Sequence, residues 1–297
     1  SISIQISCMN QYVNVSEMEG SIELPMKNDE FDEIREEYAG VLKTQLAKGN
    51  NGLMRKKYVT FGIEAENVRV AKPRLERIET DIMNNLKAMG VSSHPLSGYE
   101  RLKLLYQTMN PDLQEPFLFN FDMVARTGLS TKDFIAPTSF NFGNKSYFQM
   151  GNNIGAVSFL QILAPELSDK MLAEFLDMDN SIVVNLHVQS IDQAKAIRQI
   201  KMKITDLDKM KIEEQKKAVR SGYDMDVLPS DLVTYGGEAK KLLEDLQSRN
   251  ERMFLVTVLI MNTADTKRKL DNIIMQTAGI AQKYNCAFTR LDYQQEA

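Results

Sequence analysis

The strongest constraint on the fold is a strand–helix–strand succession near the end of the chain. Residues 252–262, "RMFLVTVLIMN", form an apolar run of strand length, well short of the roughly 20 residues that cross a bilayer. Residues 265–285 follow as a predicted helix, and residues 286–293 as a second strand. A helix flanked by two strands buries its apolar face against a sheet, which indicates a mixed α/β or α+β fold.

The first part of the chain shows the same alternation. Residues 1–9 alternate apolar and polar side chains with the period of a half-buried strand. Residues 29–52 place apolar side chains at helical spacing and end in a glycine-rich stop. A strand at 56–65 and helices at 71–90 and 98–110 are predicted next. This half is therefore predicted to be a strand–helix–strand unit of its own.

The middle of the chain joins these parts. Residues 146–163 read as two apolar runs around an Asn/Gly-rich turn, which predicts a β-hairpin. A short helix at 168–178 and a strand at 181–192 follow. We therefore expect an α+β fold with two packed, ferredoxin-like halves, a central β-hairpin and a long antiparallel helical hairpin. The expected domains are 1–126 and 127–297.

The helical hairpin is predicted at residues 193–250. Its first helix spans 193–220, with Ile197, Ile200, Ile204 and Leu207 spaced 3, 4 and 3 residues apart. That narrow apolar seam suits the packing of one helix on another. A return helix is predicted at 229–250, and we expect the pair to present a contact surface for a partner subunit.

The first helix of this hairpin carries a local excess of positive charge. The whole chain has a net charge of −4, which excludes a global basic field for nucleic acid. Residues 193–220 nevertheless hold nine Lys or Arg and four Asp or Glu. Such a face can dock anionic lipid, DNA or an acidic partner, or it can be simply solvated. The candidate interaction residues are Lys195, Arg198, Lys201, Lys203 and Lys209.

One stretch has the composition of a phosphate-binding loop. Residues 128–146, "GLSTKDFIAPTSFNFGNKS", contain glycines, hydroxyls and a terminal Lys-Ser. The nucleotide motif requires glycine directly before its lysine, but Asn144 stands there, and the position five before Gly143 is Thr138 rather than glycine. A β-like run follows Ser146 where the motif requires a helix. The spacing therefore argues against a nucleotide site.

The other candidate catalytic groups lack partners at a diagnostic spacing. His94 and His187 have no cysteine or second histidine at the spacing of metal ligands. Asp122 and Asp133 flank the loop, but nothing in the sequence places them together. Cys8 and Cys286 are most simply buried structural thiols. The residues taken alone predict no catalytic, cofactor-binding or metal site, so we expect the segment not to be an enzyme.

Several segments, in the same order, resemble the amino-terminal region of conjugative-transfer ATPases of type IV secretion systems. The resemblance is to the CagE/TrbE kind carried by mobile elements of Gram-positive bacteria. It covers nearly the whole chain. The matching segments are "KKYVTFGIEA" (56–65), "GYERLKLLYQTMNP" (98–111), "GLSTKDFIAPTSFNF" (128–142), "LPSDLVTYGGEAKKLLEDLQSRNERMFLVTVLIMNT" (228–263) and "LDNIIMQTAGIAQKYNC" (270–286).

The resemblance implies a role in a larger motor. Members of that family place the nucleotide-binding domain, with its ATP and Mg²⁺, downstream of the region matched here. They also carry chain upstream, so we expect the first half to lack its opening elements. The parent would be an ATP-driven, hexameric motor at the cytoplasmic face of the membrane. This segment would be the non-catalytic domain that anchors the motor to membrane subunits; the alternative is a DNA-binding module that uses the basic helix.

Overall fold

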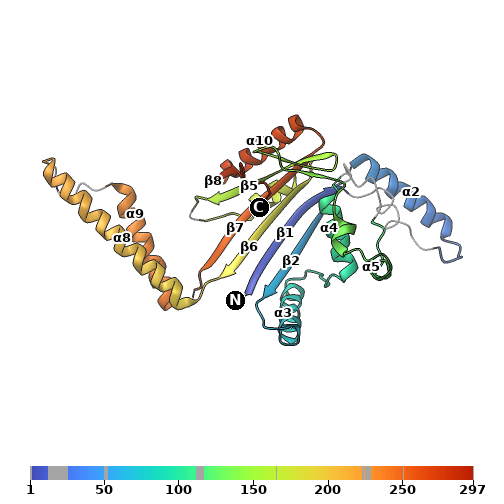
Figure 1. Cartoon of the computed structure of the whole chain (residues 1–297), viewed down its shortest axis with the longest axis horizontal. Coiled ribbons are helices and arrows are strands. Elements are labelled where there is room, and N and C mark those ends of the chain that lie inside the picture. Colours follow the sequence, from blue (N-terminus) through green and yellow to red (C-terminus); the bar gives the residue numbers. More distant parts are fainter. Residues whose placement is uncertain are drawn as a thin grey trace. The chain divides into compact units, whose positions relative to one another are not determined.

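The fold is α+β and is seen in a computed structural model (Figure 1). The structure describes residues 2–12, 26–49, 53–111, 117–164, 166–222, 224, 229–249 and 251–296. These residues form an antiparallel sheet of eight strands and nine helices. The predicted fold class is therefore confirmed at the level of α+β.

The sheet takes strands from every part of the chain. Its order is β2-β1-β6-β7-β5-β4-β3, and β8 also pairs with β5. The strands are β1 (Ile2–Tyr12), β2 (Leu53–Ile63), β3 (Phe140–Asn141), β4 (Phe148–Met150), β5 (Asn153–Ile162), β6 (Ile182–Ser190), β7 (Phe254–Ala264) and β8 (Cys286–Arg290).

Strand β5 organises half of this sheet. Along one edge it pairs antiparallel with β7, with Val157 opposite Met261. Its other edge is shared by two short strands, because β4 pairs with its first residues and β8 pairs with its last. The turn between β4 and β5 contains Gly151, whose positive φ of 58° suits a glycine. The apolar runs of residues 146–163 thus pair with each other in a hairpin.

Several helices begin at capped positions. Ser97 and Glu100 form a capping box at the start of α4, as the predicted boundary requires. The start predicted for α3 at residue 71 is wrong, because Asn67 accepts a hydrogen bond from the Val70 N–H and starts the helix earlier. The helices are α2 (Asp32–Gly49), α3 (Val68–Ala88), α4 (Gly98–Met109), α5 (Phe121–Thr127), α6 (Thr131–Ile135), α7 (Lys170–Leu176), α8 (Gln193–Arg220), α9 (Ser230–Ser248) and α10 (Lys267–Lys283).

The main core lies between the sheet and helices α7 and α10. Phe175 of α7 and Ala281 of α10 are fully buried against strand residues of β5, β6 and β7. Burial of each large side chain here contributes roughly 1.5–3 kcal/mol relative to exposure. The fully buried strand residues are Leu160, Ile182, Val184 and Ile260. This core holds together the strand–helix–strand segment that the end of the sequence predicts.

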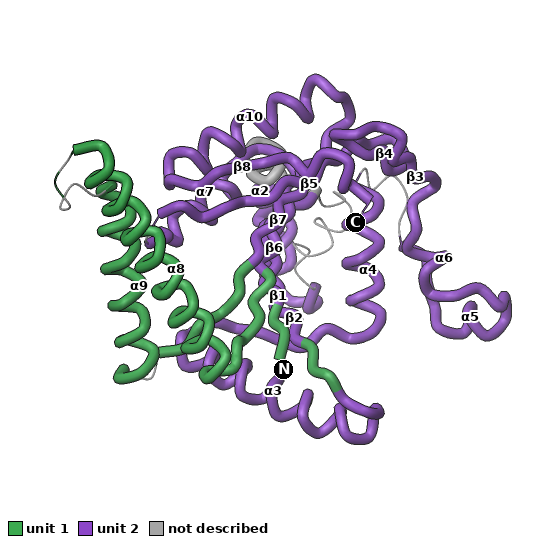
Figure 2. Tube along the Cα trace, turned by 60° about the vertical axis from the view of Figure 1, so that its left-hand side comes forward, with its two compact units in different colours: residues 1–4, 62–64, 187–256 green, residues 5–61, 65–186, 257–297 purple. Residues whose placement is uncertain are grey.

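The chain divides into two compact units (Figure 2). One unit consists of residues 1–4, 62–64 and 187–256 and includes the helices α8 and α9. The other consists of residues 5–61, 65–186 and 257–297 and includes the main core. This division differs from the predicted boundary between residues 126 and 127, which stays a prediction.

Candidate functional site

The loop that resembles a phosphate site begins as a short capped helix. Ser130 precedes α6, and both its backbone N–H and its hydroxyl donate to Asp133 Oδ2, at 2.7 and 2.8 Å. These hydrogen bonds hold the pKa of Asp133 below its ordinary value. The Asp133 carboxylate therefore caps the start of α6, as expected for an acidic residue in a turn.

The second half of the same loop is closed by its own asparagines. The Gly143 N–H donates to Asn141 Oδ1 at 2.8 Å, and the Ser146 N–H donates to Asn144 Oδ1 at 3.0 Å. Lys145 places its ammonium 5.9 Å from the centre of the Tyr293 ring. Two backbone donors of the loop are thus engaged in local turns, the use that Asn favours.

The structure does not bring together the four residues that the sequence offers as candidate catalytic groups. Asp122 lies in the first turn of α5, where its N–H donates to Asn120 Oδ1 at 3.1 Å. His94 is exposed, with Nε2 3.9 Å from Glu100 Oε1, and His187 is half-buried on β6. No hydrogen bond or ion pair joins Asp122, Asp133, His94 or His187 to another of the four.

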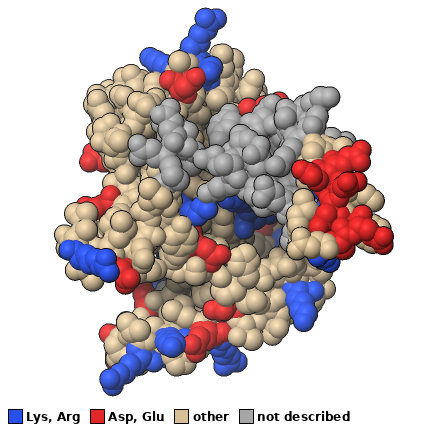
Figure 3. All heavy atoms as spheres, turned by 90° about the vertical axis from the view of Figure 1, so that its right-hand side faces the viewer, with Lys and Arg blue, Asp and Glu red and all other residues tan. Residues whose placement is uncertain are grey.

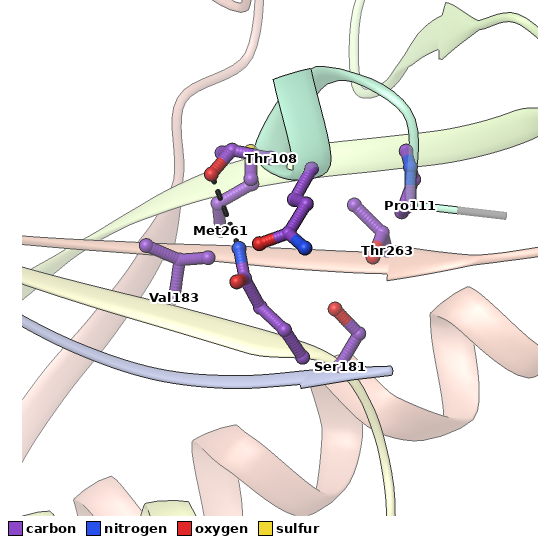
Figure 4. A pocket seen from close by; sticks show the side chains of 8 residues that line it. Thr108, Pro111, Ser181, Val183, Met261 and Thr263 are labelled. Carbon is purple, nitrogen blue, oxygen red and sulfur yellow. Dashed lines mark hydrogen bonds between the residues drawn. The ribbon is translucent and has the colours of Figure 1, made fainter. Parts of the chain in front are cut away.

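A small polar cavity of about 10 Å³ lies between the end of α4 and the sheet (Figure 4). Gln11 enters it from β1 and donates from Nε2 to Thr108 Oγ1 at 3.1 Å, while its Oε1 is buried without a partner. Ser181 and Thr263 add hydroxyls to the lining. A space of this size suits one bridging water and excludes a metabolite.

A larger hollow of about 720 Å³ opens beside the start of α10. Among the described residues that line it, the charged ones are Asp179, Asp265 and Lys269, and the last two form an ion pair of 2.6 Å. The ammonium of Lys269 lowers the pKa of Asp265, which makes this carboxylate a weak base. The remaining lining is Pro111, Asn153, Asn180, Thr263, Ala264, Asn272, Ile273 and Gln276. Sequence reasoning missed this hollow, since its residues come from five separate segments.

In the part of the chain that the structure describes, little supports a metal site or a reactive cysteine. Within it, no group of three or more His, Cys, Asp or Glu residues is placed to hold a metal ion. Cys8 and Cys286 are free and buried in the main core. Burial raises the pKa of both thiols, so they are less reactive than an exposed cysteine.

The five candidate interaction residues all lie on α8, and all are exposed. At 3.6 residues per turn, Lys195, Arg198 and Lys209 fall within an arc of about 60°. Lys201 and Lys203 lie outside this arc, one on each side. The structure therefore brings Lys195, Arg198 and Lys209 together along one side of the helix, which we call the basic line, and separates the other two.

The same line continues beyond the predicted residues. Lys216 and Arg220 fall within the arc of about 60° and are exposed. Sequence reasoning missed them, although the helical period alone would have placed them there. The line is not purely basic, because the Asp206 carboxylate lies 3.7 Å from the ammonium of Lys209.

The opposite face of α8 packs on α9 within the first compact unit. The predicted seam residues Ile197, Ile200, Ile204 and Leu207 are all partly buried. At the open end of the hairpin, Gln193 Nε2 donates to the carbonyls of Leu246 and Glu251, at 2.7 and 3.0 Å. The chain enters and leaves the hairpin side by side, since the Ile191 N–H donates to the Met253 carbonyl at 3.3 Å.

On the face drawn in Figure 3, the largest group of acidic side chains lies at the right of the view, and basic side chains are scattered. Among the helices within the described ranges, none has both the length and the apolar character needed to span a membrane.

Comparisons with models of protein families and with curated proteins found no match. The arrangement that best suits a function is therefore the exposed hairpin α8–α9.

Proposed function

We propose that this chain is a non-catalytic interaction and assembly domain of a conjugation ATPase of the type IV secretion kind. It would dock the motor to membrane subunits at the cytoplasmic face during DNA transfer, and the motor's ATP and Mg²⁺ would be bound by a domain downstream. The observation that carries the proposal is the helical hairpin α8–α9, which is inserted between strands β6 and β7. A long insertion with its own packing seam suits contact with a partner.

The exposed residues of the hairpin support a contact role. Met202 and Met210 of α8 are 53% and 51% exposed, and Tyr235 of α9 is 56% exposed. These apolar side chains lie among charged ones, the mixture typical of the rim and core of a protein interface.

The segments that carry the family resemblance coincide with ordered elements. Residues 228–263 include α9 and nearly all of β7, and residues 270–286 lie mostly within α10. The two longest of the five matching segments thus cover the hairpin's return helix and the strand and helix that follow it. These elements connect the proposed contact surface with the core.

We further infer that the segment from β5 to β8 is a split β-α-β unit of the ferredoxin-like kind. Its strand order is β8-β5-β7-β6, and α7 and α10 provide the two crossovers. This is the order expected when two β-α-β units interleave in one antiparallel sheet. The hairpin α8–α9 would then replace the short β-turn between the two middle strands.

The proposal is tested by nucleotide binding. We expect titration calorimetry of MgATP into the purified chain to show no saturable heat, with a nucleotide-binding ATPase as the positive control. The loop at residues 128–146 lacks the required spacing and engages its backbone donors internally. Saturable MgATP binding would contradict the proposal.

A second candidate is DNA binding through the basic line of α8. It is favoured by the aligned Lys195, Arg198, Lys209, Lys216 and Arg220. It predicts a gel shift whose affinity falls steeply between about 50 and 200 mM salt, because bound counterions are released. An absence of any shift at low salt removes this candidate, and α8 has no aromatic residue for base stacking.

A further inference from the structure

The outer face of α8 carries a second heptad pattern. Residues 195, 198, 202, 205, 209, 212, 216 and 219 are spaced alternately by 3 and 4. Four of these positions are basic, and three are the exposed apolar residues Met202, Ile212 and Val219, at 53%, 50% and 50% exposure. Such spacing places all eight on one stripe of a helix. We call it the basic seam.

Helix α9 carries a matching pattern of the opposite charge. Asp231, Tyr235, Glu238, Leu242 and Asp245 are spaced 4, 3, 4 and 3. Its carboxylates recur every seven residues, and between them stand Tyr235 and Leu242, 56% and 39% exposed. We call this the acidic seam. Both seams therefore combine one sign of charge with large apolar side chains.

The two seams do not serve the packing of α8 on α9 within one chain. That contact uses other positions, such as the partly buried Ile200 of α8 and the buried Leu246 of α9. Over the described ranges, no ion pair within 4.0 Å engages Lys195, Arg198, Lys216, Asp231 or Glu238. Two seam residues are exceptions: Asp245 has its Oδ1 3.3 Å from Arg249 Nη1, and Lys209 has its Nζ 3.7 Å from Asp206 Oδ1.

We propose that the basic seam binds the acidic seam of a second copy of this chain. The proposal rests on the proposed function and names one partner of the hairpin. With the helices antiparallel and Glu238 opposite Lys209, Asp231 comes opposite Lys216 and Tyr235 opposite Ile212. This register forms two charge pairs and one apolar pair, while Leu242 comes opposite Thr205 and Asp245 opposite Met202. The shared seven-residue period lets these pairs form together, as in the choice of partner by coiled coils.

A second copy fits better than an unrelated acidic partner. Both complementary stripes belong to the same chain, with the same period, on neighbouring helices. The exposed apolar residues on each stripe are unfavourable in water and are covered when the two seams meet. Nucleic acid would match the lysines of the basic seam but not its Ile212 and Val219.

The test is the mass of the full chain in solution, measured by sedimentation velocity. At about 50 mM salt we expect species heavier than the 33.8 kDa monomer, which shift towards the monomer at high salt as the charges are screened. Glu238→Lys and Lys209→Glu each place like charges in the contact. Each is expected to raise the dissociation constant about tenfold.

Mixing the two variants distinguishes a specific contact between the seams from a general effect of net charge on association. An equimolar mixture of the Glu238→Lys and Lys209→Glu chains restores opposite charges at every contact, so association returns. Glu244→Lys and Lys240→Glu make the same charge changes at exposed positions of α9 outside the acidic seam, and we expect them to associate normally.

Three results would overturn the inference. They are a wild-type chain that stays monomeric at low salt, control variants as disruptive as the seam variants, and a mixture that does not associate. None of these bears on nucleotide binding. MgATP calorimetry and capture by the membrane subunits, measured on the Glu238→Lys chain, therefore report separately on the proposed function.

Discussion

Gln193 Nε2 donates a hydrogen bond to the Leu246 carbonyl at 2.7 Å and so ties the first residue of α8 to the last turn of α9. The same amide group reaches the Glu251 carbonyl at 3.0 Å. One side chain thus closes the open end of the hairpin, next to the strands β6 and β7. We expect this junction to contribute to the stability of the proposed contact surface.

The first prediction concerns that junction. Gln193→Ala removes both hydrogen bonds and is expected to lower the free energy of unfolding by about 1–2 kcal/mol. Urea denaturation measures the change. Gln247→Ala removes an exposed amide from α9 and serves as the control. Equal effects of the two substitutions would contradict a special role for Gln193.

The second prediction is a gain in stability within α9. Gly237 lies inside the helix, and among the described residues no atom beyond its chain neighbours and the surrounding helix backbone lies within 4 Å of the position that an added Cβ would take. Gly237→Ala should therefore stabilise the chain by about 0.5–1 kcal/mol, because alanine favours the helix interior. Gly222 has a positive φ of 78°, so Gly222→Ala should destabilise. A thermal unfolding series that ranks the two in the opposite order would contradict the geometry.

The third prediction concerns the hairpin of β4 and β5. Phe148 lies opposite Gly155, and a Cβ on Gly155 would come 2.5 Å from Phe148 Cζ. Gly155→Ala should destabilise by about 1–3 kcal/mol, because the buried ring must move. Phe148→Leu in the same chain should remove part of this penalty, a coupling that a double-mutant cycle measures. Strict additivity would show that the ring and the glycine do not interact.

The fourth prediction is a stability difference that depends on pH. The hydrogen bonds from Lys283 and then Tyr284 hold the pKa of Glu174 below its ordinary value. A lowered pKa means stability that is present at neutral pH and lost as the pH falls through the folded-state pKa. Glu174→Gln should thus lower the urea midpoint at pH 7, and the difference should shrink below about pH 4.

The control for this prediction is Glu166→Gln, at an exposed position. It should change the midpoint little at any pH. A difference between wild type and Glu174→Gln that stays constant from pH 7 to pH 3 would show that the charge of Glu174 contributes nothing.

Local sequence patterns predicted the helices and strands well where the spacing of apolar residues and the capping residues indicate the same bounds. The expected bounds of α8 at 193–220 match the structure, in which the Asp192 carboxylate accepts from the Lys195 N–H at 3.1 Å. In α2 the helical spacing predicted the helix but not its burial. Phe31, Ile34 and Tyr38 are 52%, 60% and 56% exposed.

Long-range features could not be predicted in this way. The edge of β5 that is shared by β4 and β8 depends on pairing between residues more than 100 positions apart, such as Phe159 with Thr289. The hollow beside α10 is assembled from segments between Pro111 and Gln276. Local periodicity carries no information about which distant segments meet.

The candidate site was predictable in part. The sequence located the excess of charge on α8 correctly, but treated Lys201 and Lys203 as members of one face. Side chains two residues apart point about 200° from one another on a helix, so these two flank opposite sides of the basic line. Counting at the helical period from Lys195 would have found Lys216 and Arg220 instead.

The most direct test of the proposed function is whether the purified chain captures membrane subunits of a conjugation machine, the partners that this proposal assigns to it. The chain is compared with a variant in which a short Gly-Ser turn joins Ile191 to Met253, which are adjacent in the structure. The variant should keep the circular dichroism expected for the remaining sheet and helices. The account predicts that the intact chain retains these subunits and that the variant does not. Retention by both, or by neither, would contradict it.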